Sequence, residues 1–156
     1  MPAPQHPIHF IYRLVFNYLE PLMALAGVAQ VHLTPEAYMS TVFPSQRFIP
    51  SMQPILTQIT SGWFILIFHD LVTLRIYNRD ARVWKLVIAA NLLSDIAFTY
   101  STYQELGPAR FINPSLWTAN DQLTLIPTFI PLVLKVTLLL GLGIRATVED
   151  VARKNV

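Results

Sequence analysis

The feature that most constrains this chain is an apolar run of 18 residues from Leu14 to Val31, with Glu20 and Pro21 near its middle. A run of this length crosses a bilayer as a helix. A charge inside such a run is costly, and it indicates a functional position by default. Pro21 has no backbone N–H and displaces the carbonyl group four residues back, that of Asn17. We therefore expect a kinked helix with a free carbonyl beside an acid.

The composition indicates one integral membrane domain, residues 1–156. The chain is 53% hydrophobic and 13% charged, against a usual charged share of about 25%, so it lacks the residues for a charged surface. It has no cysteine, which excludes disulfides, thiol nucleophiles and thiolate metal sites. The net charge of +2 does not indicate nucleic acid as a partner, because the basic residues cluster at the ends of the expected helices.

The predicted fold is an all-α, polytopic membrane protein, a bundle of four transmembrane helices. The first helix is expected to be retained rather than cleaved as a signal peptide, because its apolar segment carries Arg13, Glu20 and Pro21. After it, Thr34-Pro35 predicts the start of a short interfacial helix. The polar tail from Arg145 is expected to begin as a helix. The transmembrane helices are predicted over 8–31, 54–77, 83–103 and 123–144, and the interfacial helix over 36–42.

Four spans place both termini on one side of the membrane. Eight of the 11 Lys and Arg residues fall at the N-terminus, in the turn after the second helix and in the C-terminal tail. Arg47 and Arg110 fall in the other two loops, and Lys135 falls inside the fourth helix. The positive-inside rule therefore predicts cytosolic termini. We expect the protein in the membrane of the endoplasmic reticulum.

Each predicted helix brings one charge to a similar depth. Glu20, Asp95 and Lys135 lie near the centres of their helices, and Asp70 lies about 6 Å toward the cytosolic side, at about 1.5 Å per residue. Such groups avoid lipid, so we expect them to face one polar pocket. The predicted catalytic acids are Glu20 and Asp95. The predicted substrate-binding residues are Asn17, Asp70, Asn91, Lys135 and Trp63.

Each of these groups also has a structural interpretation. Lys135 could pair with either Glu20 or Asp95 as an ordinary buried bridge. Asp70 could be held by His69 or reach toward the basic turn. Polar side chains that recur on one helix face also hold helices together, at about 0.6 kcal/mol per hydrogen bond; the third helix has such a stripe in Asn91, Asp95, Thr99 and Thr102.

The pocket suits proton-initiated chemistry. A carboxylic acid in apolar surroundings stays protonated at neutral pH, and a second, ionised carboxylate stabilises a cation formed by that proton. Aromatic faces add cation–π stabilisation; the candidates are Trp63, Phe64, Phe68, Phe98 and Tyr100. These groups favour isomerisation or cyclisation of an apolar isoprenoid or sterol-like molecule that enters from the lipid.

Several other chemistries have no motif in the sequence. There is no acidic cluster of the kind that binds a diphosphate through magnesium, no glycine-rich nucleotide loop, and neither a His-Glu-x-x-His nor a Gly-x-Ser-x-Gly motif. We therefore expect no cofactor and no metal.

Short motifs carry a resemblance to a known group. The first helix holds Tyr12-Arg13-Leu14-Val15-Phe16-Asn17-Tyr18-Leu19-Glu20-Pro21, the basic turn is followed by Val83-Trp84-Lys85, and the third helix holds Ser94-Asp95-Ile96-Ala97. This pattern resembles a family of small fungal four-helix membrane proteins, some of which occur in terpenoid and meroterpenoid gene clusters. It is more distantly similar to the emopamil-binding and sterol-isomerase group, which protonates a sterol double bond with buried acids. The resemblance implies that Glu20 and Asp95 are the acids.

Two other functions compete with catalysis. Small proton-coupled exporters also have four helices and a glutamate in the first. They are shorter, and their membrane core usually has few other charges. A non-catalytic lipid-binding or scaffold protein would use its polar residues for helix packing. The sequence leaves the oligomeric state open.

Overall fold

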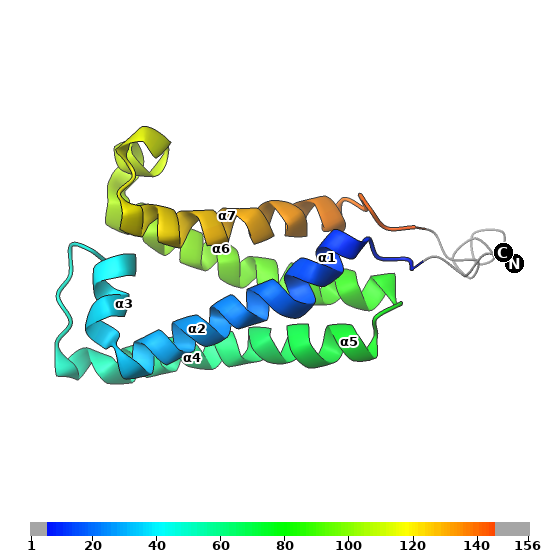
Figure 1. The fold of residues 1–156 in the computed structure, drawn as a ribbon, viewed down its shortest axis with the longest axis horizontal. Coiled ribbons are helices and arrows are strands. Elements are labelled where there is room, and N and C mark those ends of the chain that lie inside the picture. Colours follow the sequence, from blue (N-terminus) through cyan, green and yellow to red (C-terminus); the bar gives the residue numbers. More distant parts are fainter. Residues whose placement is uncertain (1–5, 146–156) are drawn as a thin grey trace, which may run out of the picture.

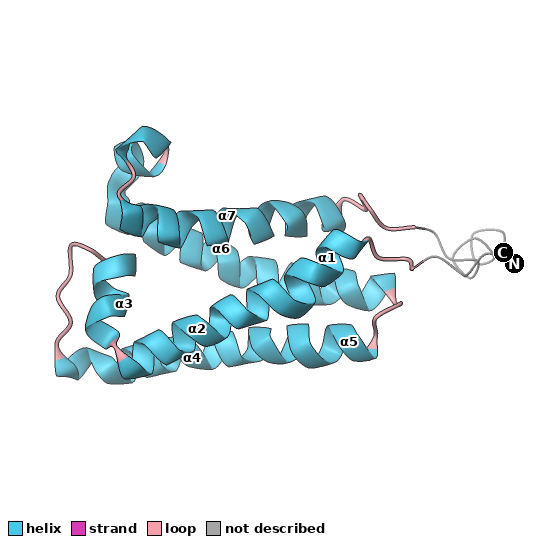
Figure 2. Ribbon diagram, viewed as in Figure 1, coloured by secondary structure: helices cyan, strands magenta, loops and turns pink. Residues whose placement is uncertain are grey.

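The structure is a computed structural model that describes residues 6–145, so the tail beyond Arg145 and its expected helix lie outside the described residues. These residues form an all-α bundle without strands (Figures 1 and 2). Four helical segments are long and apolar enough to cross a membrane: Phe10–Leu33, Pro50–Ile76, Ala81–Phe111 and Ala119–Leu139. The predicted fold class is confirmed.

Two of the four segments contain a π-helical turn. The first consists of α1 (Phe10–Leu14), the π turn η1 (Val15–Leu19) and α2 (Glu20–Leu33). The second begins with the 3₁₀ turn η2 (Pro50–Met52) and continues as α4 (Gln53–Phe68), the π turn η3 (His69–Thr73) and α5 (Leu74–Ile76). The other two are α6 (Ala81–Phe111) and α7 (Ala119–Leu139), joined through the 3₁₀ turn η4 (Pro114–Leu116).

Local sequence explains where the later helices differ from the predicted limits. The third helix continues well past 103, and Gly107 breaks it with φ 72° and ψ 162°. The fourth begins at Ala119 rather than 123 because Thr118 and Asp121 form a reciprocal capping box. It ends at Leu139 rather than 144 because Gly141 and Gly143 follow with φ of 87° and 71°, a conformation that stops a helix.

The short helix α3 (Pro35–Val42) lies where it was predicted. Pro35 occupies its first position, as expected. The Thr34 hydroxyl does not cap α3; it donates instead to the carbonyl oxygen of Gln30 at 3.4 Å. The proline therefore contributes more to this start than the hydroxyl does.

The π turn η1 accommodates Pro21. The backbone N–H of Glu20 donates to the carbonyl of Val15, five residues back, which widens the turn just before the proline. Pro21 has no N–H to donate to the carbonyl of Asn17, so that carbonyl lacks its helical partner, as the sequence predicted. It accepts a hydrogen bond from Nη2 of Arg75 at 2.9 Å. An arginine at the end of the second segment thus supplies the missing donor.

The bundle consists of two helix pairs. α2 packs along α4, and α6 packs along α7, while α3 contacts both α2 and α7. Figure 1 shows α3 standing across one end of the bundle, between the two pairs. We call this end the α3 end, and the opposite end, where the first and last described residues meet, the terminal end.

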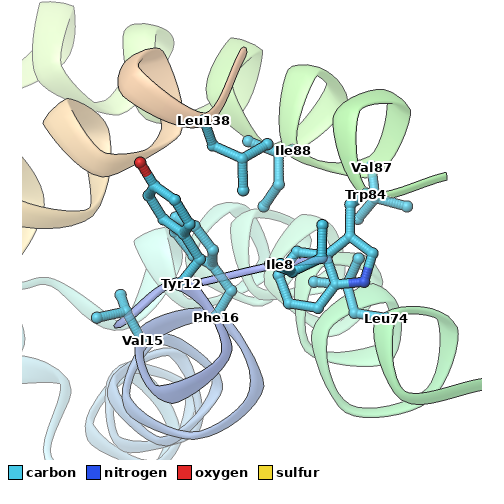
Figure 3. Close-up of a cluster of buried hydrophobic side chains, with 9 residues drawn as sticks. All are labelled: Ile8, Tyr12, Val15, Phe16, Leu74, Trp84, Val87, Ile88 and Leu138. Atoms are coloured by element: carbon cyan, nitrogen blue, oxygen red, sulfur yellow. The ribbon is translucent and has the colours of Figure 1, made fainter. Parts of the chain in front are cut away.

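A hydrophobic cluster joins the pairs at the terminal end. Trp84, Ile88 and Phe16 are fully buried there, and Figure 3 shows side chains from several helices pointing toward one another. The cluster consists of Ile8, Tyr12, Val15, Phe16, Leu74, Trp84, Val87, Ile88 and Leu138. A second cluster packs α3 at the opposite end; it consists of Val31, Tyr38, Met39, Val42 and Leu56.

The two described ends of the chain lie side by side, at the same end of the bundle. His9 N donates to the carbonyl of Gly143 at 3.0 Å, and Arg145 N donates to that of Pro7 at 2.9 Å. The Tyr12 hydroxyl donates to the carbonyl of Leu142 at 2.9 Å. Large hydrophobic side chains are exposed along all four long segments, which fits association with lipid.

Replacing Gly143 by alanine is expected to destabilise the terminal end. The added Cβ would lie 2.7 Å from Cε2 of Tyr12, at a φ of +71° that costs a non-glycine residue about 1–2 kcal/mol. The matched control is Gly62→Ala, because a Cβ at this helical position meets nothing within 4 Å. Thermal unfolding of the purified protein in detergent should show a lower Tm for Gly143→Ala and an unchanged or higher one for Gly62→Ala. Equal Tm values would contradict this account.

Candidate functional site

A buried lysine joins three helices near the middle of the bundle. Lys135 on α7 is fully buried. Its Nζ donates to Oδ2 of Asp95 on α6 at 2.6 Å, and also to Oε1 of Glu20 on α2. The prediction that these three charges share one level is confirmed, and Lys135 pairs with both acids rather than with one. We call Glu20, Lys135 and Asp95 the lysine triad.

The triad closes one end of a cavity of about 490 Å³ between the two helix pairs. Glu20 and Asp95 both line the cavity, and their side chains are 11% and 16% exposed. Tyr38, Thr41 and Val42 of α3 line its other end. The cavity thus lies between the triad and α3, and most of its lining is apolar.

The edge of the cavity reaches the outer surface of the bundle. Met23 on α2 and Leu123 on α7 line the cavity and are 39% and 67% exposed. In a bundle that crosses a membrane, such side chains face lipid. An apolar molecule could therefore enter sideways, between α2 and α7, without passing through water.

Aromatic rings form part of the cavity wall. Trp63 on α4 packs edge to face with Tyr38, with 6.0 Å between the ring centroids. Its ring also lies on Gly27, where a Cβ would come within 2.9 Å of it. Burial raises the pKa of Tyr38 to about 12, so its phenol stays neutral at physiological pH. Phe98 also lines the cavity.

The other predicted aromatic faces point elsewhere. Phe64, Phe68 and Tyr100 are 52%, 57% and 59% exposed and do not line the cavity. Their predicted part in cation stabilisation is wrong for this cavity. They lie on the outer face of the bundle, where lipid would cover them.

A second buried polar pair lies on the terminal side of the triad. Asp70 in η3 and Asn91 on α6 are both fully buried, and Nδ2 of Asn91 donates to Oδ1 of Asp70 at 2.9 Å. The sequence suggested His69 or the basic turn as the partner of Asp70, and neither is found. His69 does not bind Asp70. Arg75 instead stacks over Tyr18, with 4.9 Å from its guanidinium carbon to the ring centroid, and donates to Asn17.

The predicted site residues therefore form two groups. Glu20, Asp95 and Trp63 line the cavity. The other four do not line it. Lys135 binds the two acids. Asn17, Asp70 and Asn91 are buried deeper in the bundle, beside the triad. Their predicted direct contact with a substrate is not supported by this arrangement, because they do not reach the cavity wall.

Sequence reasoning missed part of the cavity wall. Thr124, Thr128 and Pro131 line it together with the α3 residues. With Lys135 they recur at intervals of four, three and four residues, which places them on one face of a helix. That spacing was the available signal. No such signal marked Tyr38, whose place depends on how α3 folds back.

Removal of the amine at Lys135 is expected to destabilise the bundle strongly. In Lys135→Met the two carboxylates lose their shared cation, and breaking a buried ion pair costs about 3–5 kcal/mol. Adding Glu20→Gln and Asp95→Asn to this variant should restore much of the lost stability, because no unpaired charge is then left. Chemical unfolding in detergent measures both effects. A triple variant no more stable than Lys135→Met would contradict the charge explanation.

The described residues contain no group of three or more His, Asp or Glu side chains placed to hold a metal ion. Comparison with curated proteins and with solved structures gives no match. A family of proteins defined by a domain of unknown function, DUF7704, matches residues 5–145. Because this match covers nearly the whole chain of 156 residues, the protein belongs to the DUF7704 family.

Proposed function

We propose that this protein is a membrane-embedded isomerase or cyclase of an apolar isoprenoid or sterol-like molecule. Glu20 would act as the proton donor and Asp95 as the carboxylate that stabilises the cation. One observation carries the proposal: two carboxylates from different helices line the same apolar cavity beside an opening on the lipid-facing surface.

The cavity wall favours an uncharged substrate. Its volume of about 490 Å³ falls within the range of about 300–1,000 Å³ that small-molecule sites occupy. In the described chain no Arg or Lys lines it, so a diphosphate would find no cationic partner there. The two acids would repel such a group. An isoprenoid alcohol, epoxide or hydrocarbon meets neither obstacle.

The chemistry follows from the different roles of the two acids. A protonated Glu20 transfers its proton to a double bond or epoxide oxygen of the substrate, and the substrate becomes a carbocation. The carboxylate of Asp95, held by Lys135 at 2.6 Å, stabilises that cation through space. Loss of a proton from a neighbouring carbon to a carboxylate ends the reaction, so the product has the mass of the substrate.

Lys135 is assigned to positioning. It is fully buried and does not line the cavity, so it does not touch the substrate. Its Nζ sets the spacing of the two carboxylates and keeps Asp95 ionised while Glu20 gains and loses a proton. The resemblance to small fungal membrane proteins of terpenoid clusters supports the same substrate class.

Glu20→Gln is expected to abolish turnover. A general acid contributes about 10²- to 10⁴-fold to a rate, and glutamine keeps the shape of the side chain but cannot donate that proton. Microsomes that contain the protein would be incubated with unsaturated and epoxidised isoprenoids, and isomers of equal mass measured by chromatography with mass spectrometry. Asp95→Asn should lose activity as well. Glu36→Gln, at an exposed position of α3, is the matched control and should keep it.

Full activity in both Glu20→Gln and Asp95→Asn would contradict the assignment of the acids. A pH gradient that drives efflux from vesicles and disappears in Glu20→Gln would identify the exporter instead. Loss of folding in both variants, with no product from the unchanged protein, would favour the non-catalytic scaffold.

We further propose that the terminal end faces the cytosol in the endoplasmic reticulum. The exposed turn at 77–80 and the described termini lie at that end, whereas the exposed loop at 44–47 lies beyond α3.

The sequence contains no Asn-x-Ser/Thr acceptor in which x is a residue other than proline. Pro44→Asn with Gln46→Thr should therefore give a glycosylated protein. Asp80→Ser, which places an acceptor at Asn78, should not. The reverse pattern would contradict this orientation.

A further inference from the structure

Several buried acceptors in the polar core of the bundle have no donor. Five buried side-chain oxygens have no hydrogen-bond partner among the described residues: Asn17 Oδ1, Glu20 Oε2, Asp70 Oδ2, Asn91 Oδ1 and Thr99 Oγ1. The first four can only accept in their ordinary states, whereas the Thr99 hydroxyl can also donate. A buried polar atom without a partner destabilises the folded state. No described side chain donates to these acceptors, which lie close to the lysine triad.

The charges show the same imbalance. The core holds three acids, Glu20, Asp95 and Asp70, and Lys135 already binds the first two. Asp70 is fully buried, and its hydrogen-bond partner, the amide of Asn91, is neutral. An ionised carboxylate in such a place is expensive unless a cation pairs with it. One proton on Asp70 removes that charge and adds a donor.

We propose that Asp70 and Asn91 form a proton-binding site behind the cavity, which stores a proton and supplies it to Glu20. The supply step rests on the proposed function; the storage step does not. In the resting protein Asp70 carries the proton, while Glu20 and Asp95 are the ionised partners of Lys135. This assignment differs from the sequence-based expectation, in which Glu20 or Asp95 held the proton.

The charged neighbours of Asp70 are the members of the lysine triad. Glu20 from the first segment, Asp95 from α6 and Lys135 from α7 lie close enough for their charges to act on its carboxyl group. When a substrate occupies the cavity, the O–H bond of Asp70 breaks and an O–H bond forms on Glu20, which then protonates the substrate. Asp70 becomes a carboxylate that keeps the hydrogen bond from Asn91. The proton that the substrate cation loses at the end of the reaction returns through Glu20 and restores Asp70.

The backbone around Asp70 sets this position apart from the rest of its helix. Asp70 lies in the π turn η3, which contacts the other π turn, η1. No proline explains η3, unlike η1. π turns are frequent at functional sites, where they redirect side chains. The two wide turns place Asn17 and Asp70 on neighbouring stretches of the first two segments.

Infrared spectroscopy tests storage directly, without a substrate. The purified protein in lipid bilayers at neutral pH should show the carbonyl stretching band of a protonated carboxyl group. Asp70→Asn should remove that band, and the exposed control Asp80→Asn should leave it. A spectrum without the band, or a band that Asp70→Asn leaves in place, would overturn the proposal. A band lost only in Glu20→Gln would place the proton on Glu20 and overturn storage at Asp70, while the proposed function would stand.

Stability and turnover provide two further readouts. Asparagine resembles a protonated aspartic acid, so Asp70→Asn should keep the Tm of the unchanged protein; a Tm that falls as far as that of Lys135→Met would show that Asp70 is ionised and overturn the proposal. With an active substrate, Asp70→Asn should lower kcat at least tenfold with little change in KM, and the loss should deepen as the pH rises. A kcat unaffected at every pH would refute the supply step.

Discussion

The buried ammonium group of Lys135 is the contact on which the rest of the structure depends. It ties α2 to α6 and α7, and thereby joins the two helix pairs at the middle of the bundle. In a low-dielectric interior neither the amine nor the acids could be left alone, so each holds the others in place. The same contact also sets the chemistry. It orders two carboxylates at the end of an apolar cavity, with their spacing imposed by a shared donor.

Packing at the two ends of the bundle keeps that cavity open. At the terminal end a hydrophobic cluster holds the pairs together, and at the other end α3 stands between them with Tyr38, Met39 and Val42 buried. The two pairs therefore meet at their ends and at the triad, and the remaining space is lined by α2, α4, α6 and α7. A short helix that covers little of the membrane-spanning surface thus decides whether the bundle contains a site.

The polar groups behind the triad indicate a core selected for more than stability. Asp70 and Asn91 could be replaced by apolar residues at no loss of packing in principle, and buried polar groups often stabilise less than such replacements. Their unpaired oxygens, together with the π turn η3 that no proline explains, are features that a purely structural bundle would not need. The proton that we propose on Asp70 would remove one buried charge and supply one donor.

The sequence by itself determined the four spans, the position of α3, the loss of a backbone donor at Pro21 and the shared depth of Glu20, Asp95 and Lys135. Each of these depends on distance along one helix or on local chemistry, which the order of residues specifies directly. Only the tertiary structure decided that Lys135 binds both acids, that Asn91 rather than His69 holds Asp70, and that Arg75 supplies the donor for Asn17. Those contacts depend on how each helix is rotated and which helix lies beside it, and residues far apart in the chain decide that jointly through packing.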